Sequence, residues 1–441
     1  MPGDKFIPSV LYNLFGNGLA GILQVISGIL LARHLGVSQW GELSLLLLVP
    51  PLMFNFASFG FEAATTHLVG AAKVSVRECQ VFNLVSSICL VIFGFLIAPW
   101  ILKLALQNSH GTLLIGNRLM ILMACLAIMV FGKLQGAIVL GQSRFRTANM
   151  ILFSQHAIYF AGVCSLMYTG MVSIDHILLL YLASQVVGAF LNFWCVMSTK
   201  SSTASTQLGL SGYFRMAFSY GIRVQAANLT AFLNYRADIL ILNYFHGPNA
   251  VGLYKIAVDL AEKLWLIPMS IGKAIFSKSA GVKKGPEFCQ HLTATIQLSF
   301  YSTLIIVVIV AIVFGYVIPE VYGREYVESV VPFRWLLFGI LAGSVTKVVS
   351  NAISAIGRPG INSFHTSIAL CVNVVANLAL IPSFSIAGAA IGTSIAYIIL
   401  AGVKLMATKG LLGGSMSGWY RFPVQHVRLI LDKSKSILKA P

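Results

Sequence analysis

The sequence is poor in charged residues and rich in apolar ones. Charged residues make up 10% of its 441 positions and hydrophobic residues 57%, whereas an ordinary soluble domain is about 25% charged and about 45–50% apolar. A water-soluble chain of this size could not hide so much apolar surface. The composition therefore excludes soluble enzymes, disordered scaffolds and secreted disulfide modules, and it predicts a polytopic membrane protein.

The known sequence motifs of catalysis and metal binding are also missing. The chain has no Walker A sequence, no GxSxG, no HExxH and no aspartate-rich metal motif. Its 9 histidines are scattered without an i, i+4 pair, and its 7 cysteines form no CxxC pair. We therefore expect a protein that is not an enzyme and that needs no cofactor and no metal. The absent Walker A sequence excludes transport driven by ATP hydrolysis in this chain.

Long apolar runs fill the sequence instead. A spanning helix needs about 20 mostly apolar residues, and about twelve such runs occur, which predicts an all-α fold. The expected spans are roughly 8–32, 42–64, 81–106, 117–140, 147–169, 174–197, 214–244, 250–277, 292–318, 331–356, 361–382 and 386–408.

The excess of positive charge predicts the orientation in the membrane. The net charge is +17, which we attribute to topology, so no nucleic acid partner is expected. With the N-terminus inside, 18 Lys and Arg fall in inside segments and 4 in outside segments, as cytoplasmic loops require. Both termini should be cytoplasmic. Residues 409–441 form a basic tail, either an amphipathic helix on the anionic leaflet or a solvated segment.

The two halves of the chain look duplicated. Gly36 and Gly41 recur 211 positions later as Gly247 and Gly252, and Asn17 recurs as Asn228. We predict two six-helix lobes, 1–199 and 212–408, joined by a cytoplasmic linker at 200–211. An even number of spans in each lobe relates them by a pseudo-two-fold axis along the membrane normal, which is a transporter design.

Charged residues inside spans mark candidate sites, because each costs roughly 2.5–3.5 kcal/mol at the bilayer centre. The first half holds chiefly Glu62 and Lys133. Spans seven and eight hold Arg223, Arg236, Asp238, Lys255, Asp259, Glu262 and Lys263. The last four share one helix face, which is either a neutralised seam or belongs to a site. Arg223 has no acid within four residues on its helix, so it needs a partner, and an anionic ligand is one candidate.

Span one carries a stripe of amide and small residues. Asn13, Asn17, Gly21, Gln24 and Gly28 lie on one helical face. Two interpretations stay open: amides offered to a hydroxyl-rich ligand, or close helix packing.

Three segments carry a resemblance to a known family. They are Leu31-Ala32-Arg33-His34-Leu35-Gly36-Val37-Ser38-Gln39-Trp40-Gly41, then Arg236-Ala237-Asp238 through Gly252-Leu253-Tyr254 to Pro268, and Asn377-Leu378-Ala379-Leu380-Ile381-Pro382 followed by Gly388-Ala389. Over about residues 5–408 the chain resembles the Wzx-type polysaccharide and O-antigen flippases of the multidrug/oligosaccharidyl-lipid/polysaccharide exporter superfamily. Family members usually have Tyr where this chain has Trp40.

The resemblance implies twelve helices in two lobes around a central cationic cavity. It implies that an undecaprenyl-diphosphate-linked oligosaccharide moves from the cytoplasmic to the periplasmic leaflet of the bacterial inner membrane by alternating access, coupled to H⁺ or Na⁺. A polysaccharide polymerase or ligase is an expected partner beside the lipid bilayer. The expected site comprises cavity cations (Arg223, Arg236, Lys255, Lys263), a polar lining (Asn13, Asn17, Gln24, Asn228) and ion-coupling or pairing acids (Asp238, Asp259, Glu262, Glu62).

Two alternatives remain. A drug/cation antiporter of the same superfamily would present acids to the cavity from the first half, where this chain offers mainly Glu62. A membrane polymerase or transferase acting on lipid-linked sugars would need a sizeable outer loop, and the short loops argue against it.

Overall fold

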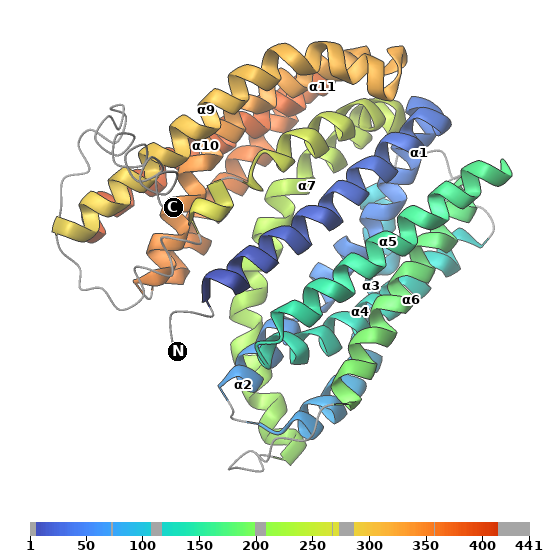
Figure 1. Cartoon of the computed structure of the whole chain (residues 1–441), viewed down its shortest axis with the longest axis vertical. Coiled ribbons are helices and arrows are strands. Elements are labelled where there is room, and N and C mark those ends of the chain that lie inside the picture. The colour runs from blue at the N-terminus through green and yellow to red at the C-terminus, as the bar shows by residue number, and fades with distance from the viewer. Residues whose placement is uncertain are drawn as a thin grey trace, which may run out of the picture. The chain divides into compact units, whose positions relative to one another are not determined.

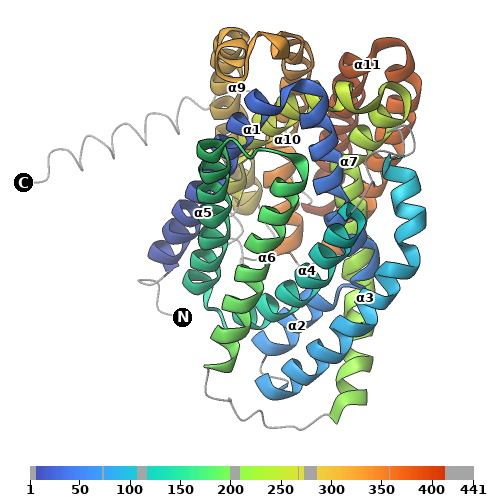
Figure 2. The ribbon, with the colours of Figure 1, turned by 90° about the vertical axis from the view of Figure 1, so that its right-hand side faces the viewer.

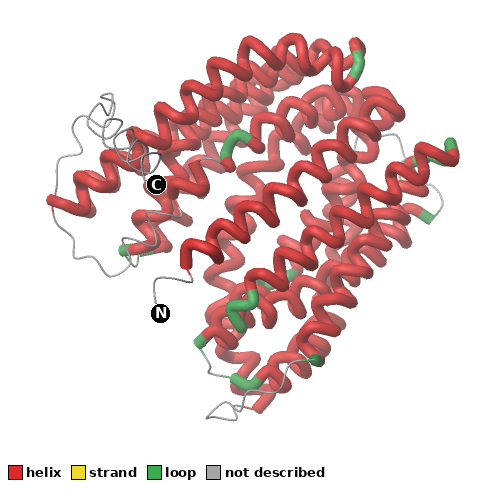
Figure 3. Tube along the Cα trace, in the orientation of Figure 1, coloured by secondary structure: helices red, strands yellow, loops and turns green. Residues whose placement is uncertain are grey.

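The structure, a computed structural model, describes residues 6–71, 74–106, 117–198, 209–266, 268–272, 286–356 and 358–412. Helices joined by short turns account for these residues, and no strand occurs among them (Figure 3). The predicted linker at 200–211 and the predicted tail at 409–441 lie largely outside the described residues.

The helices follow the predicted apolar runs closely (Figure 1). They are α1 (Phe6–Ala57), α2 (Phe61–Gly70), α3 (Val76–Leu106), α4 (Arg118–Gly141), α5 (Phe145–Thr169), α6 (Ile174–Met197), α7 (Gly209–Lys263), α9 (Pro286–Tyr322), the 3₁₀ helix η3 (Arg324–Ser329), α10 (Val330–Ala355) and α11 (Pro359–Leu412). Eight of the described helices are long and apolar enough to cross a membrane. The all-α polytopic fold is thus confirmed.

Three of these helices each join two of the predicted spans, although spans two and eight were expected to extend beyond the ends of α1 and α7. The backbone leaves helical geometry at Gly36 in α1, at Gly247 in α7 and at Ser385 in α11. Gly36 has φ 73° and ψ 172°, and its repeat mate Gly247 has φ 73° and ψ −173°. Glycine is almost the only residue that adopts this conformation. The same elbow therefore occurs twice, 211 positions apart. Dividing the described helices at these points, with α2 counted as the continuation of span two, gives the predicted twelve.

α7 is not among the eight apolar helices because of its charges. It carries the cluster that the sequence placed in spans seven and eight, which no ordinary spanning helix would hold. Pro50 and Pro51 of α1 lie inside continuous helix, and the helix ends later, at Ala57.

Proximity of Cα atoms divides the chain into two compact units. The first unit comprises residues 1–255 with 321–326, and the second comprises 256–320 with 327–441. The first unit thus includes most of α7. The six-helix lobes at 1–199 and 212–408 stay a prediction, because a unit defined by proximity is not a repeat.

Within the first unit, α1 packs on α3, α4 and α5, and α4 packs on α6. α5 and α6 run side by side in Figure 2. The core of this unit is a continuous apolar face of α1 that includes Leu43, Leu46, Val49 and Met53, all fully buried. In the second unit α10 packs on α11, and Val345, Val348 and Val349 pack against Leu292 and Ile296 of α9.

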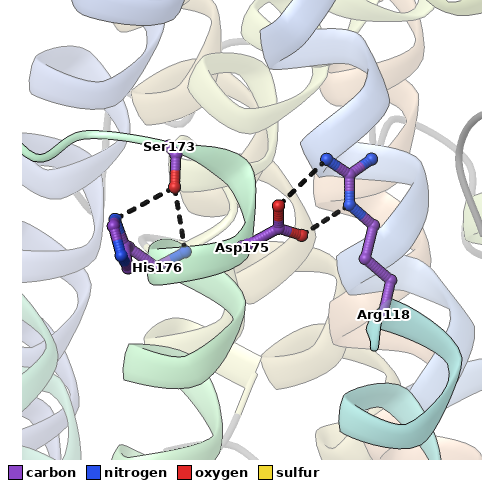
Figure 4. Close-up of polar contacts among 4 residues, drawn as sticks. All are labelled: Arg118, Ser173, Asp175 and His176. Atoms are coloured by element: carbon purple, nitrogen blue, oxygen red, sulfur yellow. Dashed lines mark hydrogen bonds and ion pairs between the residues drawn. The ribbon is translucent and has the colours of Figure 1, made fainter. Parts of the chain in front are cut away.

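The helix starts of α4 and α6 meet at one end of the first unit (Figure 4). The Arg118 Nε donates to Asp175 Oδ1 at 2.6 Å. Ser173 caps α6 by accepting the backbone N–H of His176 at 3.2 Å. The predicted topology puts both helix starts on the outer side of the membrane, and their adjacency fits two spans that run in the same direction.

Candidate functional site: a polar cavity in the first unit

A polar cavity of about 720 Å³ lies in the first unit. It is bounded by the end of α1, the turn after it, and segments of α2, α4 and α7. The lining residues are Pro51, Phe54, Asn55, Ser58, Gly60, Glu62, Ala63, Thr66, His67, Lys133, Tyr220, Gln225, Asn228 and Phe232. Charged, amide and hydroxyl groups converge here in a chain that is otherwise mostly apolar, which makes this cavity the candidate site.

A broken helix shapes one wall of the cavity. α1 ends at Ala57, Phe59 has φ 46° and Gly60 has φ 71°, and α2 then begins at Phe61. A Cβ added to Gly60 would lie 2.1 Å from the carbonyl oxygen of Gly221 in α7, and one added to Gly221 would lie 2.5 Å from that of Phe59. The two backbones touch because neither glycine has a side chain. Broken helices of this kind are common at transport sites, where they leave backbone groups for a ligand.

Gln225 fastens the broken helix to α7. The Ser58 hydroxyl donates to Gln225 Oε1 at 3.0 Å, and Gln225 Nε2 donates to the Asn55 carbonyl. Gln225 is buried, with 7% of its surface exposed. The Asn55 carbonyl lies at the end of α1, where it has no helical partner, and Gln225 supplies the missing hydrogen bond. Gln225 therefore holds the turn after α1 in place.

Two opposite charges face the cavity from different helices. The Lys133 amine of α4 lies 5.0 Å from the centre of the Phe54 ring, a cation–π contact. Glu62 is half-buried in the first turn of α2. Neither side chain forms an ion pair with another described residue. Each charge is therefore open to a ligand in the cavity.

An aromatic pair forms another stretch of the wall. The rings of His67 in α2 and Tyr220 in α7 stack with centroids 4.5 Å apart and planes 2° apart. Both side chains are exposed to the cavity. An aromatic surface of this kind suits the apolar C–H face of a sugar ring or a planar group.

Two of the predicted site residues, Glu62 and Asn228, line this cavity. Arg223 does not: it is exposed, and its Nη2 donates to Ser219 Oγ at 3.3 Å. Gln24 is also exposed and outside the lining. Asn13 and Asn17 belong to α1, but their side chains lie outside the described residues.

The remaining predicted residues belong to α7. The Asp238 carboxylate is 2% exposed and accepts hydrogen bonds from the Tyr254 hydroxyl at 2.6 Å and from the Ile239 backbone N–H at 2.8 Å. These hydrogen bonds hold the carboxylate in place, and ion coupling or pairing by Asp238 stays a prediction. Arg236 is half-buried and donates to the Tyr235 carbonyl at 3.0 Å. Four charged residues were predicted to share one helix face: Lys255, Asp259, Glu262 and Lys263. They are half-buried, and each makes polar or charged contacts.

Sequence reasoning missed four lining residues. Lys133 is predicted only as a charge within a span, and the sequence pattern predicts no role for His67, Tyr220 and Gln225. The signal for His67 was present, because Glu62, Thr66 and His67 fall on one side of a helix. It was overlooked because span two was drawn as one helix to residue 64, which hid the separate helix α2.

One protein-family model matches a large stretch of the chain. It is described as polysaccharide biosynthesis protein, and it matches residues 30–331. The chain belongs to this polysaccharide biosynthesis protein family. The match covers more than half of the sequence and includes the cavity and all of α7.

Curated relatives agree with this assignment. A Shigella flexneri protein assigned as an O-antigen transporter is 22% identical over 421 residues, which are 90% of this chain and 96% of that protein. A Haloferax volcanii protein assigned as a low-salt glycan biosynthesis flippase is 22% identical over 88% of this chain and 79% of its own length. An uncharacterised membrane protein of Methanocaldococcus jannaschii is 30% identical over 192 residues, only 38% of its length.

Among solved structures, the lipid II flippase MurJ in an inward closed conformation matches with a TM-score of 0.76. The match covers 98% of this chain and 93% of MurJ at 16% sequence identity. At that identity the likeness shows a shared fold.

Proposed function

We propose that this protein is a flippase for a lipid-linked oligosaccharide. It takes an undecaprenyl-diphosphate-linked repeat unit of an O-antigen or similar surface polysaccharide at the cytoplasmic leaflet of the inner membrane. It releases that unit at the periplasmic leaflet by alternating access. Its relatives assigned as an O-antigen transporter and a glycan flippase support this proposal.

One observation carries the proposal: a cavity of about 720 Å³ that offers a cation, a carboxylate, amides and a flat aromatic pair inside apolar helices. A sugar presents hydroxyl groups that amides bind, and a diphosphate presents oxyanions that a lysine attracts. The lipid tail needs only the apolar surroundings that the helices already provide.

We assign Lys133 to the anionic headgroup and Asn228 to sugar hydroxyls. Glu62 is the candidate for coupling to H⁺ or Na⁺, because its carboxylate lies in the same cavity as Lys133. Substrate contact by Arg223, Arg236, Lys255 and Lys263, coupling by Asp259 or Glu262, cytoplasmic termini, and a polymerase or ligase partner stay predictions. The proposal includes no catalytic step.

The test uses cells that lack the chain. Their lipids are extracted, and the diphosphate-linked oligosaccharide is scored for its leaflet with a membrane-impermeant probe. We expect complete units to accumulate on the inner leaflet and the wild-type gene to relieve this accumulation. Lys133→Met should fail to relieve it, with the flipping rate reduced at least about tenfold, because a charged hydrogen bond is lost.

Lys103→Met is the matched control, since Lys103 is an exposed lysine of α3 that does not line the cavity. Both variants must reach the membrane at wild-type levels by immunoblot. If Lys133→Met relieves the accumulation as well as Lys103→Met does, the cavity is not the headgroup site. If deletion causes no accumulation on the inner leaflet, the flippase proposal fails.

A second candidate is a drug/cation antiporter, and the position of Glu62 favours it. A carboxylate that faces a cavity without an ion pair among the described residues suits a cationic substrate. In that case Glu62→Gln abolishes cation efflux from loaded cells, and deletion of the gene causes no accumulation of lipid-linked oligosaccharide on the inner leaflet. The flippase proposal predicts the opposite pair of results.

A further inference from the structure

A lysine is buried in the second unit without an acidic partner among the described residues. Lys404 of α11 is 3% exposed, and its amine donates to the hydroxyl of Ser350 in α10. No carboxylate of the described residues pairs with it. Moving a lone ammonium into a protein interior costs several kcal/mol unless an opposite charge compensates.

Further basic groups surround this amine. Lys347 lies one helical turn before Ser350, half-buried, with its amine 4.5 Å from the centre of the Trp265 ring. His365 follows at the start of α11, 7% exposed, and its Nδ1 has no hydrogen-bond partner among the described residues. The Lys404 charge is repelled by that of Lys347, and it repels a protonated His365 in turn.

The Asn362 side chain links the two helices that carry these groups. The Asn362 side-chain Nδ2 donates to the Ser350 carbonyl at 2.8 Å and to Ser354 Oγ at 3.0 Å, which fixes the start of α11 against α10. His365 lies one turn after Asn362, so it faces the same stretch of α10. The arrangement is built into the packing of two helices and does not depend on flexible surface side chains.

We infer that Lys404, Lys347, Ser350 and His365 form a binding site for an oxyanion of the phosphate class. Such an ion accepts hydrogen bonds from the ammonium groups and from the imidazole, and it supplies the negative charge that no described carboxylate supplies to Lys404. The Ser350 hydroxyl donates to the Thr346 carbonyl and accepts from the Lys404 amine, so it positions that amine. Lys347 and Ser350 are half-buried, while Lys404 and His365 are buried.

Two sources can deliver this chemistry: the diphosphate of a lipid carrier and free phosphate or pyrophosphate. The first source rests on the proposed function. The predicted topology puts Lys404 and His365 near the cytoplasmic ends of their spans, at the leaflet where a charged carrier lipid would be collected.

The test titrates inorganic pyrophosphate into the purified full chain in nanodiscs of zwitterionic lipid and follows the thermal unfolding midpoint. Sodium chloride at equal ionic strength is the salt control. We expect a saturable rise of the midpoint for the wild type and an affinity at least about tenfold weaker for Lys404→Met. Without ligand, Lys404→Met should melt at or above the wild-type temperature, because a buried, uncompensated cation has been removed.

Ser350→Ala provides a second variant that keeps the helix packing, and it should weaken pyrophosphate binding while Lys103→Met leaves it unchanged. The inference is overturned if the midpoint does not rise saturably with pyrophosphate. It is also overturned if wild type and Lys404→Met respond alike, which would leave Lys404 a structural hydrogen-bond donor.

Undecaprenyl diphosphate included in the nanodisc separates the two sources. Competition with pyrophosphate at a Lys404-dependent site supports the carrier lipid, and binding of pyrophosphate without competition supports a free anion. The flippase proposal can fail in the leaflet assay while pyrophosphate binding persists. Conversely, loss of pyrophosphate binding would overturn this site and leave the flippase proposal standing.

Discussion

Replacing Gly41 by alanine tests how α1 and α7 touch near their elbows. Gly41 and its repeat mate Gly252 lie against each other across the two helices. A Cβ added to Gly41 would lie 1.8 Å from the Pro248 carbonyl oxygen, and one added to Gly252 would lie 2.1 Å from the Val37 carbonyl oxygen. Residues 37 and 248 are themselves 211 apart, so the contact is reciprocal and follows the internal repeat.

The size of the effect follows from these distances. A carbon and an oxygen need about 3.0 Å or more, so one backbone must retreat by more than 1 Å, and the obstacle is a carbonyl that cannot rotate away. Overpacking of this kind costs roughly 1–3 kcal/mol, or more where backbones must move. Gly→Ala inside a helix otherwise stabilises by about 1 kcal/mol. We therefore expect Gly41→Ala to destabilise the protein by roughly 2 kcal/mol or more.

The assay is the thermal unfolding midpoint of the purified chain in detergent, followed by the loss of the monodisperse peak in size-exclusion chromatography. Gly402→Ala is the matched control, since Gly402 is a helical glycine with no neighbouring atom within 4 Å of an added Cβ. Its midpoint should equal or exceed that of the wild type. If Gly41→Ala has the same thermal unfolding midpoint as Gly402→Ala, the contact is refuted.

The double variant sharpens the test. Once Gly41→Ala has pushed the helices apart, Gly252→Ala meets less obstruction, so the two losses should sum to more than the loss in the double variant. Strictly additive losses would mean that the two glycines do not share one contact.

Other variants test single features of the structure. Gly247→Ala should lower the thermal midpoint, since its backbone at φ 73° and ψ −173° costs about 1–3 kcal/mol for any side chain; a wild-type midpoint would count against the elbow. Gln225→Ala should cost roughly 1–3 kcal/mol in the same assay by leaving buried polar groups without partners, and no loss would deny its fastening role. Asp175→Asn should cost less than about 1 kcal/mol and leave flipping in the leaflet assay unchanged, because the carboxylate is 54% exposed; a flipping defect would contradict a peripheral position. Tyr254→Phe removes a hydrogen-bond donor to buried Asp238 and should destabilise the protein by roughly 1–3 kcal/mol. An unchanged midpoint would contradict a structural role for this hydrogen bond.

The fold could be predicted almost completely from the sequence. Spanning helices are set by the length of apolar runs, and α6 begins and ends where the run from 174 to 197 does. The elbow at Gly36 was visible as a repeat, since glycine recurs wherever the backbone needs its freedom. What the runs could not show was the break at Ser58–Gly60, because apolar residues continue on both sides of it.

The site was predicted less well for a related reason. A charged residue in a membrane span costs free energy, but its position in the sequence does not show which way its side chain points. Glu62 and Asn228, which line the candidate cavity, are predicted as site residues because they are polar residues within apolar runs. Arg223 drew attention for the same reason, yet it lies outside the cavity lining. Gln225 gave no signal, since its task depends on a carbonyl 170 residues away.

The two glycine contacts of α1 have a consequence for access to the cavity. α1 touches α7 by backbone at Gly41, and the turn that follows α1 touches it again at Gly60. These glycines are about 19 residues apart, roughly 28 Å along a helix. That distance is close to the thickness of the hydrocarbon core.

In the predicted topology one contact lies near each face of the membrane, with the polar cavity beside the Gly60 contact. A route between α1 and α7 must therefore open at either the Gly41 or the Gly60 contact. Gly41→Ala disturbs only the outer contact, so a change in the leaflet at which substrate becomes accessible would identify that contact as a gate, while a loss of stability alone would identify it as a rigid joint.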